Sequence, residues 1–264
     1  MNSPIVMITG ATSGIGKATA LRFAQEGYRV ILTGRRTQRL DALQATLEKE
    51  YQTDALSVTL DVQDKHAVSQ AIEKLPSDWK NISILVNNAG TALTTDSIQT
   101  GDPDNWDIMI DTNIKGLLYV TRAILPGMLE RNSGHIINVG SIAGHEYYPG
   151  GNVYSATKHA VKAINKSLRL DLLGEPIRVS SVDPGMVYTE FSAVRWNDVE
   201  KADKFYEGID TLQAEDIADA IAYCAQVPPH VNIEDMVVMP TCQASTNHVK
   251  RKDSSEHGTF IDSD

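Results

Sequence analysis

A glycine-rich turn, Thr9-Gly10-Ala11-Thr12-Ser13-Gly14-Ile15-Gly16, joins a short apolar run at Ile5–Thr9 to a segment of helical periodicity at Gly14–Glu26. Glycine permits a tight turn in which the backbone lies open to a ligand, and the helix that follows adds unpaired N–H groups and the positive end of its dipole. The glycines do not keep the G-x-G-x-x-G spacing, so the motif alone also fits a turn that binds nothing. A strand, such a turn and a helix are typical of the first unit of a parallel α/β sheet.

The same alternation of short apolar runs and longer helix-period segments continues to residue 240, which is typical of βαβ units. The predicted strands are Ile5–Thr9, Arg29–Thr33, Ala55–Leu60, Ile82–Asn87, His135–Gly140, Ile177–Val182 and Met236–Met239. The predicted helices are Gly14–Glu26, Gln38–Lys49, Lys65–Leu75, Asn105–Leu129, Val153–Leu173 and Ala214–Gln226. We therefore predict an α/β fold, in which residues 1–240 form a single-domain Rossmann-type doubly wound parallel sheet of seven strands with helices on both faces.

Two segments depart from this alternation. Residues 186–212 are rich in aromatic and charged side chains and are long enough to form a lid or a substrate-facing insertion. Residues 241–264 form a polar C-terminal tail, in which Lys250-Arg251-Lys252 precedes acidic and serine residues. We expect this basic run to be solvated rather than to bind nucleic acid.

Composition limits the partners of this chain of 264 residues, in which 34 acidic side chains outnumber 24 basic ones. A net charge of −10 argues against a surface that neutralises nucleic acid phosphates or anionic lipid, so an anionic ligand needs a local basic pocket. Cys224 and Cys242 are too few for a disulfide framework, and no cysteine or histidine group has metal-ligand spacing. The opening Met1-Asn2-Ser3-Pro4 leads into no leader-length or bilayer-length apolar segment. We expect a soluble, cytoplasmic protein that binds no metal, nucleic acid or membrane.

The end of the second predicted strand reads Thr33-Gly34-Arg35-Arg36. A fold that selects NAD places a carboxylate there, about 20 residues after the glycine turn, to accept from the ribose 2′-hydroxyl. Here two guanidinium groups stand where a 2′-phosphate would lie, so the sequence favours NADP over NAD. The alternative is a solvated arginine pair, but positive charge at a helix N-terminus is unfavourable unless an anion compensates it.

Three further turns follow later strands at their carboxyl ends, where ligands bind in open α/β sheets. They are Leu60-Asp61-Val62, Asn87-Asn88-Ala89-Gly90 and Asp183-Pro184-Gly185. Asp61 could accept a hydrogen bond from an adenine amino group, and the Asn-Ala-Gly turn allows backbone contact with a ribose. Each turn alone is better explained by ordinary turn chemistry, and only their joint position on one sheet edge indicates a cofactor.

Ser141, Tyr154 and Lys158 are the strongest candidates for a catalytic site. Ser141 closes the fifth predicted strand, and Tyr154 and Lys158 are four residues apart, so they share one helix face. A phenol with a pKa of about 10 is a poor base at neutral pH, but an adjacent ammonium lowers that pKa. Lys158 could supply this charge and also hold the nicotinamide ribose, while Ser141 would hydrogen-bond the substrate oxygen. A lone Y-x-x-x-K motif would otherwise be an exposed helix turn.

Asn113 is a fourth candidate, in the stretch Asp111-Thr112-Asn113-Ile114-Lys115-Gly116. Asparagine and glycine both disfavour a helix interior, yet here they lie within a long helix-period segment. Such a break in local preference is expected at functional positions. Asn113 could hold a water that passes protons to Lys158 and Tyr154, or it could be a surface residue on a marginal turn.

These motifs, in this order, resemble those of the short-chain dehydrogenase/reductase family: the T-G-x-x-x-G-x-G turn, N-N-A-G, an Asn–Ser–Tyr–Lys tetrad and a P-G turn after the sixth strand. Shorter stretches, such as Gly150-Gly151-Asn152-Val153-Tyr154 and Thr189-Glu190-Phe191-Ser192, resemble the branch of NADP-dependent 3-hydroxy acid dehydrogenases, which includes serine and L-allo-threonine dehydrogenases. The resemblance implies a homotetramer whose dimer contacts use the predicted helices Asn105–Leu129 and Val153–Leu173. The cofactor contacts that it implies are Gly10, Ser13, Gly14, Ile15, Gly16, Arg35, Arg36, Asp61, Asn88, Tyr154, Lys158, Pro184, Gly185, Val187 and Thr189. To these the turns above add Val62, Ala89 and Gly90.

The family likeness and the tetrad together predict hydride transfer between NADP(H) and the 3-position of a small 3-hydroxy acid, such as serine, L-allo-threonine or 3-hydroxyisobutyrate. Tyr154 would exchange the hydroxyl proton, and Arg195 is one candidate partner for the substrate carboxylate, although it could equally be solvated. Residues that could shape the pocket wall, or simply pack, are His145, Tyr147 and Tyr148. Two alternatives stay open: a reductase of other ketones, aldehydes or pterin-like carbonyls, and a non-catalytic NADP-sensing binding protein.

Overall fold

A seven-stranded parallel sheet forms the centre of the computed structural model, which describes residues 3–252 and 259–260. The strands are β1 (Ile5–Ile8), β2 (Arg29–Gly34), β3 (Ala55–Thr59), β4 (Ile82–Asn87), β5 (Gly134–Val139), β6 (Ile177–Pro184) and β7 (Asp235–Val238). Their order, β3-β2-β1-β4-β5-β6-β7, runs outward from β1 to one edge and then from β4 to the other. The predicted doubly wound Rossmann-type sheet is confirmed, because this order reverses direction between β1 and β4.

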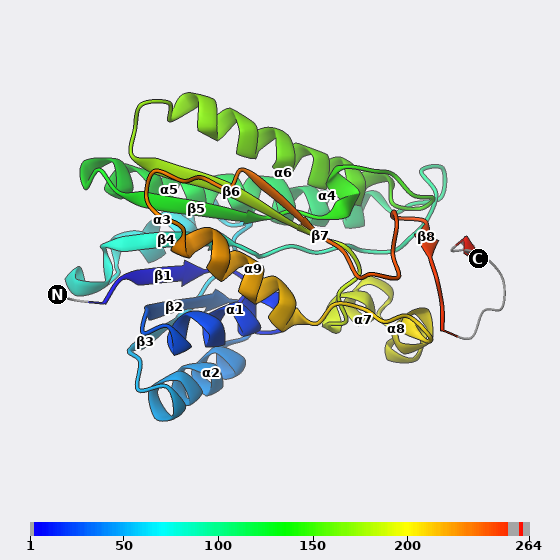
Figure 1. Ribbon diagram of the computed structural model, residues 1–264, viewed down its shortest axis with the longest axis horizontal. Coiled ribbons are helices and arrows are strands. Elements are labelled where there is room, and N and C mark those ends of the chain that lie inside the picture. Colours follow the sequence, from blue (N-terminus) through cyan, green and yellow to red (C-terminus); the bar gives the residue numbers. More distant parts are fainter. Residues whose placement is uncertain (1–2, 253–258, 261–264) are drawn as a thin grey trace.

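Helices cover both faces of the sheet (Figure 1). One face carries α1 (Gly14–Gln25), α2 (Thr37–Glu50) and α9 (Ala214–Gln226). The other carries α3 (Lys65–Glu73), α4 (Pro103–Ile110), α5 (Leu117–Glu130) and α6 (Asn152–Asp171). Single 3-10 turns, η1 (Ser77–Trp79) and η3 (Ile142–Gly144), lie in the connections before β4 and after β5.

Alternate residues of the central strands serve two separate hydrophobic cores. In β1, Val6 and Ile8 pack into the core beneath α1 and α9, whereas Ile5 and Met7 pack into the core beneath α3 and α5. Both faces of such a strand are buried, which explains why the strands are apolar throughout instead of alternating with polar residues. The rigid sheet therefore fixes the positions of the turns at its carboxyl edge.

The glycine-rich turn after β1 needs glycine for two different reasons. Gly10 and Gly14 have positive φ angles, +68° and +50°, which other residues adopt only with strain. At Gly16 a Cβ atom would overlap the carbonyl oxygen of Gly10, so this glycine lets α1 start directly against the turn. The backbone of the turn consequently lies open at the N-terminus of α1.

The predicted single helix at Asn105–Leu129 is wrong in one respect. It is divided into α4 and α5 by η2, a π-helical segment at Asp111–Gly116. The wider π turn accommodates one extra residue, and such segments are frequent at functional sites. Gly116 is the last residue of the π-helical segment. A Cβ atom at this position would lie 2.6 Å from a methyl group of Val62, so the glycine permits close packing against the turn after β3.

Residues 186–212 form two short helices, α7 (Glu190–Trp196) and α8 (Val199–Tyr206), beyond the carboxyl edge of the sheet (Figure 1). The segment that follows β7 packs against this insertion, and β8 (His248–Val249) pairs antiparallel with β9 (Thr259–Phe260). The guanidinium of Arg251 donates to the carbonyl oxygens of Phe205 and Glu207.

The expectation of a solvated basic run is therefore wrong for Arg251. Upstream of it, the Gln243 and Thr246 side chains are buried. Sequence composition could not reveal this packing, because the polar side chains form hydrogen bonds with backbone groups that are far away in the chain.

None of the helices in the part of the chain that the structure describes combines the length and the apolar character that crossing a bilayer requires.

Candidate active site

A cavity of about 850 Å³ lies at the carboxyl edge of the sheet, between the strand ends and the insertion that carries α7 and α8. It begins at the glycine-rich turn and extends past the ends of β4 and β5 to the aromatic side chains of α7 and α8. A volume of this size accommodates a dinucleotide together with a small substrate, and ligands bind at this edge in open α/β sheets.

Nearly all of the predicted site residues line this single cavity. Those that do are Gly10, Ser13, Gly14, Ile15, Arg35, Arg36, Asp61, Val62, Asn88, Ala89, Gly90, Ser141, Tyr154, Lys158, Pro184, Gly185, Val187 and Thr189. Gly16 does not line it, because it supports the turn from behind, and Asn113 lies behind Gly90. Of the expected wall residues Tyr148 lines the cavity, whereas His145 and Tyr147 do not.

The arginine pair lies at the end of the cavity near the glycine-rich turn. The Arg36 guanidinium donates to the hydroxyls of Thr12 (2.6 Å) and Ser13 (2.7 Å) and pairs with Glu190 Oε2 at 3.1 Å. Arg39 also pairs with Glu190, at 2.8 Å, and Arg35 Nη1 lies 3.8 Å from a carboxylate oxygen of Asp61. These arginines make the local basic pocket that the negative net charge requires for an anionic ligand.

Ser141, Tyr154 and Lys158 meet at the middle of the cavity. The Ser141 hydroxyl accepts from the backbone N–H of Ala143 (3.1 Å), which fixes its direction, and it lies near enough to the Tyr154 phenol to lower the pKa of that phenol. Lys158 Nζ lies 5.8 Å from the centroid of the Tyr154 ring and donates to the carbonyl oxygen of Val139 at 2.9 Å. The helical spacing of Tyr154 and Lys158 thus places both side chains on the face of α6 that meets the end of β5.

Burial dominates the electrostatics of these two groups. It raises the pKa of the Tyr154 phenol, while the nearby Arg195 charge and the hydrogen bond with Ser141 lower that pKa. Burial also lowers the pKa of the Lys158 ammonium to about 8, and the negative charge of Asp183 raises it. In the protein without cofactor, the cation that favours the phenolate most strongly is therefore Arg195 of α7.

The side chain of Asn113 is engaged with protein groups. Its Oδ1 accepts from the N–H of Thr91 (2.8 Å), and its Nδ2 donates to the carbonyl oxygen of Thr91 (2.8 Å) and to the hydroxyl of Thr157 (3.0 Å). The amide therefore ties the loop after β4 to α6. One lone pair of Oδ1 is still available, so the side chain could hold a water only by accepting a hydrogen bond from it.

Arg195 brings a half-buried positive charge to the substrate end of the cavity. Its guanidinium carbon lies 5.3 Å from the ring centroid of Tyr154 and 5.1 Å from that of Phe191, and its charge lowers the pKa of the Tyr148 phenol, which burial raises. Its Nε is buried without a hydrogen-bond partner. Because the side chain lines the cavity and carries a positive charge, it is suited to pair with an anionic ligand that enters the cavity.

The cavity also contains residues that the sequence did not single out. Glu190 and the last polar residues, Gln243, Thr246 and Asn247, line it as well. The Gln243 side chain accepts from the N–H of Met186 (2.8 Å), and Thr246 donates to Glu146. Sequence similarity at Thr189-Glu190-Phe191-Ser192 carried a signal for Glu190, but the polar tail carried none.

A family model described as short chain dehydrogenase matches residues 4–200 of this chain. The chain belongs to the short-chain dehydrogenase family. The resemblance inferred from the sequence motifs is therefore confirmed.

The chain is also similar along most of its length to named relatives. The NADP-dependent 3-hydroxy acid dehydrogenase YdfG of Salmonella typhi is 48% identical over 242 residues, which are 91% of this chain and 96% of the relative. Sulfoacetaldehyde reductase 2 of Chromohalobacter salexigens is 47% identical over 244 residues, 92% of this chain and 96% of the relative.

Two solved structures agree with the fold over nearly the same span. The closed form of a serine dehydrogenase complexed with NADP+ has a TM-score of 0.88 and 46% identity, and covers 91% of this chain and 96% of that chain. The serine dehydrogenase from Escherichia coli has a TM-score of 0.80 and 42% identity, with 91% and 99% covered.

Proposed function

We propose that this protein is an NADP-dependent oxidoreductase that transfers a hydride between NADP(H) and the hydroxyl-bearing carbon of a small acid. In this class of substrate a single further carbon atom lies between the hydroxyl-bearing carbon and the acid group. The observation that carries the proposal is the position of Arg195, which lines the same cavity as Ser141, Tyr154 and Lys158 with its guanidinium carbon 5.3 Å from the Tyr154 ring. These residues combine proton exchange with the binding of an anion. Similarity to a 3-hydroxy acid dehydrogenase supports this substrate class.

The residues at the glycine-rich end of the cavity fit NADP. Gly10, Gly14 and Gly16 leave the backbone free of side chains at the N-terminus of α1, where a pyrophosphate binds favourably. Arg35 and Arg36 would hold the 2′-phosphate, and Lys158 the nicotinamide ribose. NADP, when bound, supplies or accepts the hydride. Supporting contacts are proposed for Ser13, Ile15, Asp61, Val62, Asn88, Ala89, Gly90, Pro184, Gly185, Val187 and Thr189, all on the cavity wall.

Tyr154 is proposed to take the hydroxyl proton during oxidation and to return it during reduction. Ser141, which lines the cavity together with Tyr154, would donate to the substrate oxygen and hold it beside the phenol. Burial favours the protonated phenol, and the positive charge of Arg195 opposes that effect when Tyr154 acts as a base. The predicted effect of Lys158 on the pKa of Tyr154 is proposed to add to it. Asn113 contributes indirectly, by holding the loop that carries Thr91 against α6.

Arg195 is proposed to bind the acid group. A 3-hydroxy acid and the two-carbon sulfonate alcohol that corresponds to sulfoacetaldehyde share one spacing, because a single carbon separates the reacting carbon from the carboxyl carbon or the sulfur. The 5.3 Å between the Arg195 guanidinium carbon and the Tyr154 ring suits so short a substrate. Lys201 and Lys204 also line the cavity and add positive charge.

Replacing Arg195 by methionine tests the assignment. We expect kcat/KM for serine, L-allo-threonine and 3-hydroxyisobutyrate to fall about 10- to 100-fold, because a charged hydrogen bond contributes roughly 1.5–3 kcal/mol. Turnover of an uncharged alcohol of similar size should fall less, because it loses only the effect of Arg195 on the pKa of Tyr154 and not the contact with the acid group. Steady-state assays with NADP and with NAD measure both effects. Lys201→Met is the matched control, since it removes another cation from the cavity wall.

Equal losses on charged and uncharged substrates would contradict a role of Arg195 in binding the acid group. Faster turnover of uncharged ketones or aldehydes than of any small acid by the unmodified protein would favour the alternative carbonyl reductase. Binding of NADP without turnover of any substrate would favour the sensing protein. Tyr154→Phe gives the reference for loss of the chemical step, and near-normal turnover in it would exclude Tyr154 as the proton donor and acceptor.

We further propose a homotetramer that works in the cytoplasm. Exposed apolar side chains support contacts between copies: Leu118 of α5 is 40% exposed, and Leu170 of α6 is 76% exposed. Free thiols at Cys224 and Cys242 suit a reducing compartment. Sedimentation velocity tests the assembly, and cell fractionation tests the location; a monomer, or an exported protein, would contradict them.

A further inference from the structure

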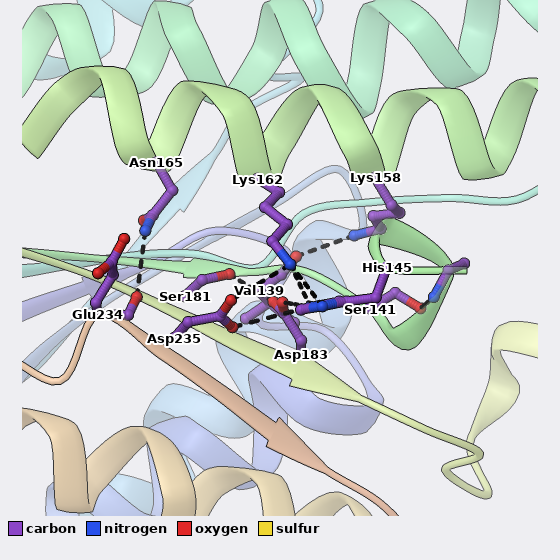
Figure 2. A network of polar contacts seen from close by, with 11 residues as sticks. Val139, Ser141, His145, Lys158, Lys162, Asn165, Ser181, Asp183, Glu234 and Asp235 are labelled. Carbon is purple, nitrogen blue, oxygen red and sulfur yellow. Dashed lines mark hydrogen bonds and ion pairs between the residues drawn. The ribbon is translucent and has the colours of Figure 1, made fainter. Parts of the chain in front are cut away.

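A polar cluster lies outside the cavity, directly behind Ser141 and Lys158 (Figure 2). It draws on four parts of the fold: His145 follows η3, Lys162 lies on α6 one turn after Lys158, Asp183 is near the end of β6, and Asp235 begins β7. No step of the proposed mechanism uses these side chains.

Asp183 is the buried centre of this cluster, with 1% of its surface exposed. One carboxylate oxygen accepts from the hydroxyl of Ser181 and the other from Nε2 of His145, each at 2.5 Å. A Cβ atom at Gly140 would overlap Oδ1 of Asp183. The carboxylate therefore packs against the backbone of the residue that precedes Ser141.

The hydrogen-bond partners of His145 indicate which ring nitrogen carries the proton and whether Asp183 is ionised. Lys162 Nζ lies 2.5 Å from Nδ1 of His145 and 3.5 Å from a carboxylate oxygen of Asp235. An ammonium only donates, so Nδ1 accepts and the proton of the neutral ring lies on Nε2, facing Asp183. With His145 and Ser181 both donating, Asp183 accepts on both oxygens, as an ionised carboxylate does. Burial and the neighbouring Asp235 carboxylate raise the pKa of Asp183 above its ordinary value, and the hydrogen bonds from Ser181 and His145 oppose this rise and favour the ionised form.

Lys158 and Asp183 meet at the same piece of backbone. Lys158 Nζ donates to the carbonyl oxygen of Val139 at 2.9 Å (Figure 2). Asp183 packs against Gly140, the next residue in the chain. Taking the Lys158 ammonium out of water disfavours its charge, and a nearby carboxylate restores it. The negative charge of Asp183 acts on Lys158 in this direction.

We propose that Asp183 is a positioning residue, held ionised by His145 and Ser181, which keeps the ammonium of Lys158 protonated while Lys158 holds the cofactor ribose. The inference rests on the proposed function, because it assigns Lys158 that task. The charged and titratable groups that face Asp183 are His145, Lys158, Lys162, Asp235 and Tyr154, and those that face Lys158 are Tyr154 and Asp183.

A bound metal ion is a weaker explanation of the same cluster. His145, Asp183 and Asp235 offer three ligand atoms within 4.8 Å of one another. Lys162 lies among them, however, and its ammonium already contacts His145 and Asp235. That positive charge balances the carboxylates and would repel a divalent cation.

The test compares variants that remove either the hydrogen bond from His145 or the charge of Asp183 with a variant that keeps both. His145→Leu removes the donor, Asp183→Asn removes the charge, and His145→Gln replaces the ring by an amide that can still donate to Asp183. His159→Gln is the matched control. His159 lies on α6 next to Lys158 and stacks on Tyr147, and its Nδ1 lies within hydrogen-bond distance of the carbonyl oxygen of Ser155 and not of Asp183. Thermal unfolding establishes that each variant is folded.

The first readout is the pH dependence of kcat/KM for reduction of a small 3-oxo acid by NADPH. In this direction Tyr154 must carry its proton, and its raised pKa keeps it protonated, so the alkaline decline reports the loss of the Lys158 proton. Removing the charge of Asp183 lowers the pKa of Lys158, which is about 8 in the unmodified protein, so the decline must begin at lower pH. We expect kcat/KM just above the wild-type decline to fall about tenfold in His145→Leu and Asp183→Asn, and to stay at the wild-type value in His145→Gln and His159→Gln.

The second readout needs no turnover. The Cε resonance of Lys158 in carbon-13 lysine-labelled protein without cofactor, assigned by its absence in Lys158→Met, follows the protonation of the amine directly. We expect its titration to move to lower pH in the same two variants. A titration at the wild-type pH in folded His145→Leu and Asp183→Asn would overturn the proposal, as would an equal shift in His145→Gln. Because this readout is independent of substrate, failure of the proposed function would leave it intact.

Discussion

Glu190 supplies the anion that the arginines at the start of α2 require. Arg36 occupies the N-cap position of α2, where the helix dipole disfavours positive charge. Glu190, in the first turn of α7, pairs with both Arg36 and Arg39. Because Arg36 and Glu190 both line the cavity, a 2′-phosphate would meet the same guanidinium groups and the carboxylate that neutralises them.

Replacing Glu190 by glutamine should therefore tighten the binding of NADP. We expect the dissociation constant to fall about fivefold, because the repulsion between two charges near a protein surface is of the order of 1 kcal/mol. NAD lacks the 2′-phosphate and should bind Glu190→Gln as it binds the unmodified protein. Calorimetric titration with both nucleotides measures the difference. Weaker NADP binding would instead indicate that Glu190 orients the arginines for the phosphate.

At the scale of single residues, the sequence predicted the groups that belong to short motifs. Gly10, Ser141, Tyr154 and Lys158 could be found because each sits in a local pattern whose chemistry is independent of distant residues. The partners that set their charges could not be found in this way. Glu190 is 151 positions from Arg39, and only packing of α7 against the start of α2 brings them together.

The π-helical segment between α4 and α5 shows how an element serves the site. Its extra residue places Asn113 toward the loop after β4, and Gly116 allows the segment to pack closely on Val62. The sequence indicated a disturbance here, because asparagine and glycine disfavour a helix, but it could not indicate the π form. That form depends on contacts with Thr91 and Thr157, which come from two other parts of the chain.

Replacing Asn113 by alanine should destabilise the protein as well as slow it. The change leaves the N–H and the carbonyl oxygen of Thr91 and the hydroxyl of Thr157 without their present partner, which costs about 1–3 kcal/mol. We expect a lower Tm in the protein without cofactor, measured by calorimetry, together with a lower kcat/KM. Asn105→Ala in α4, which touches none of these groups, is the control. An unchanged Tm with reduced kcat would instead support a role confined to proton transfer.

At the scale of the whole molecule, the chain after the sheet returns to cover the cavity. The seven-stranded sheet is complete at Val238, and the following residues pack between the loop after β5 and the insertion 186–212. Thr246 and Asn247 bond to the loop that follows η3, and Arg251 bonds to the end of α8. This arrangement follows from neither hydropathy nor periodicity, because its contacts are polar and distant in sequence.

Two truncations should separate the part of this segment that forms the cavity wall from the part beyond it. Ending the chain after Pro240 removes Gln243, Thr246 and Asn247 from the wall and leaves the N–H of Met186 without its present partner. We expect KM for the acid substrate to rise about tenfold, since the lost hydrogen bonds contribute roughly 0.5–1.5 kcal/mol each, while circular dichroism stays that of the intact sheet. Ending it after Lys252 keeps these residues and should leave KM within about twofold of the full-length value, because no wall residue is lost. Steady-state kinetics on both proteins decides the matter: equal KM values in the two truncations would mean that the segment 241–252 does not shape the substrate site.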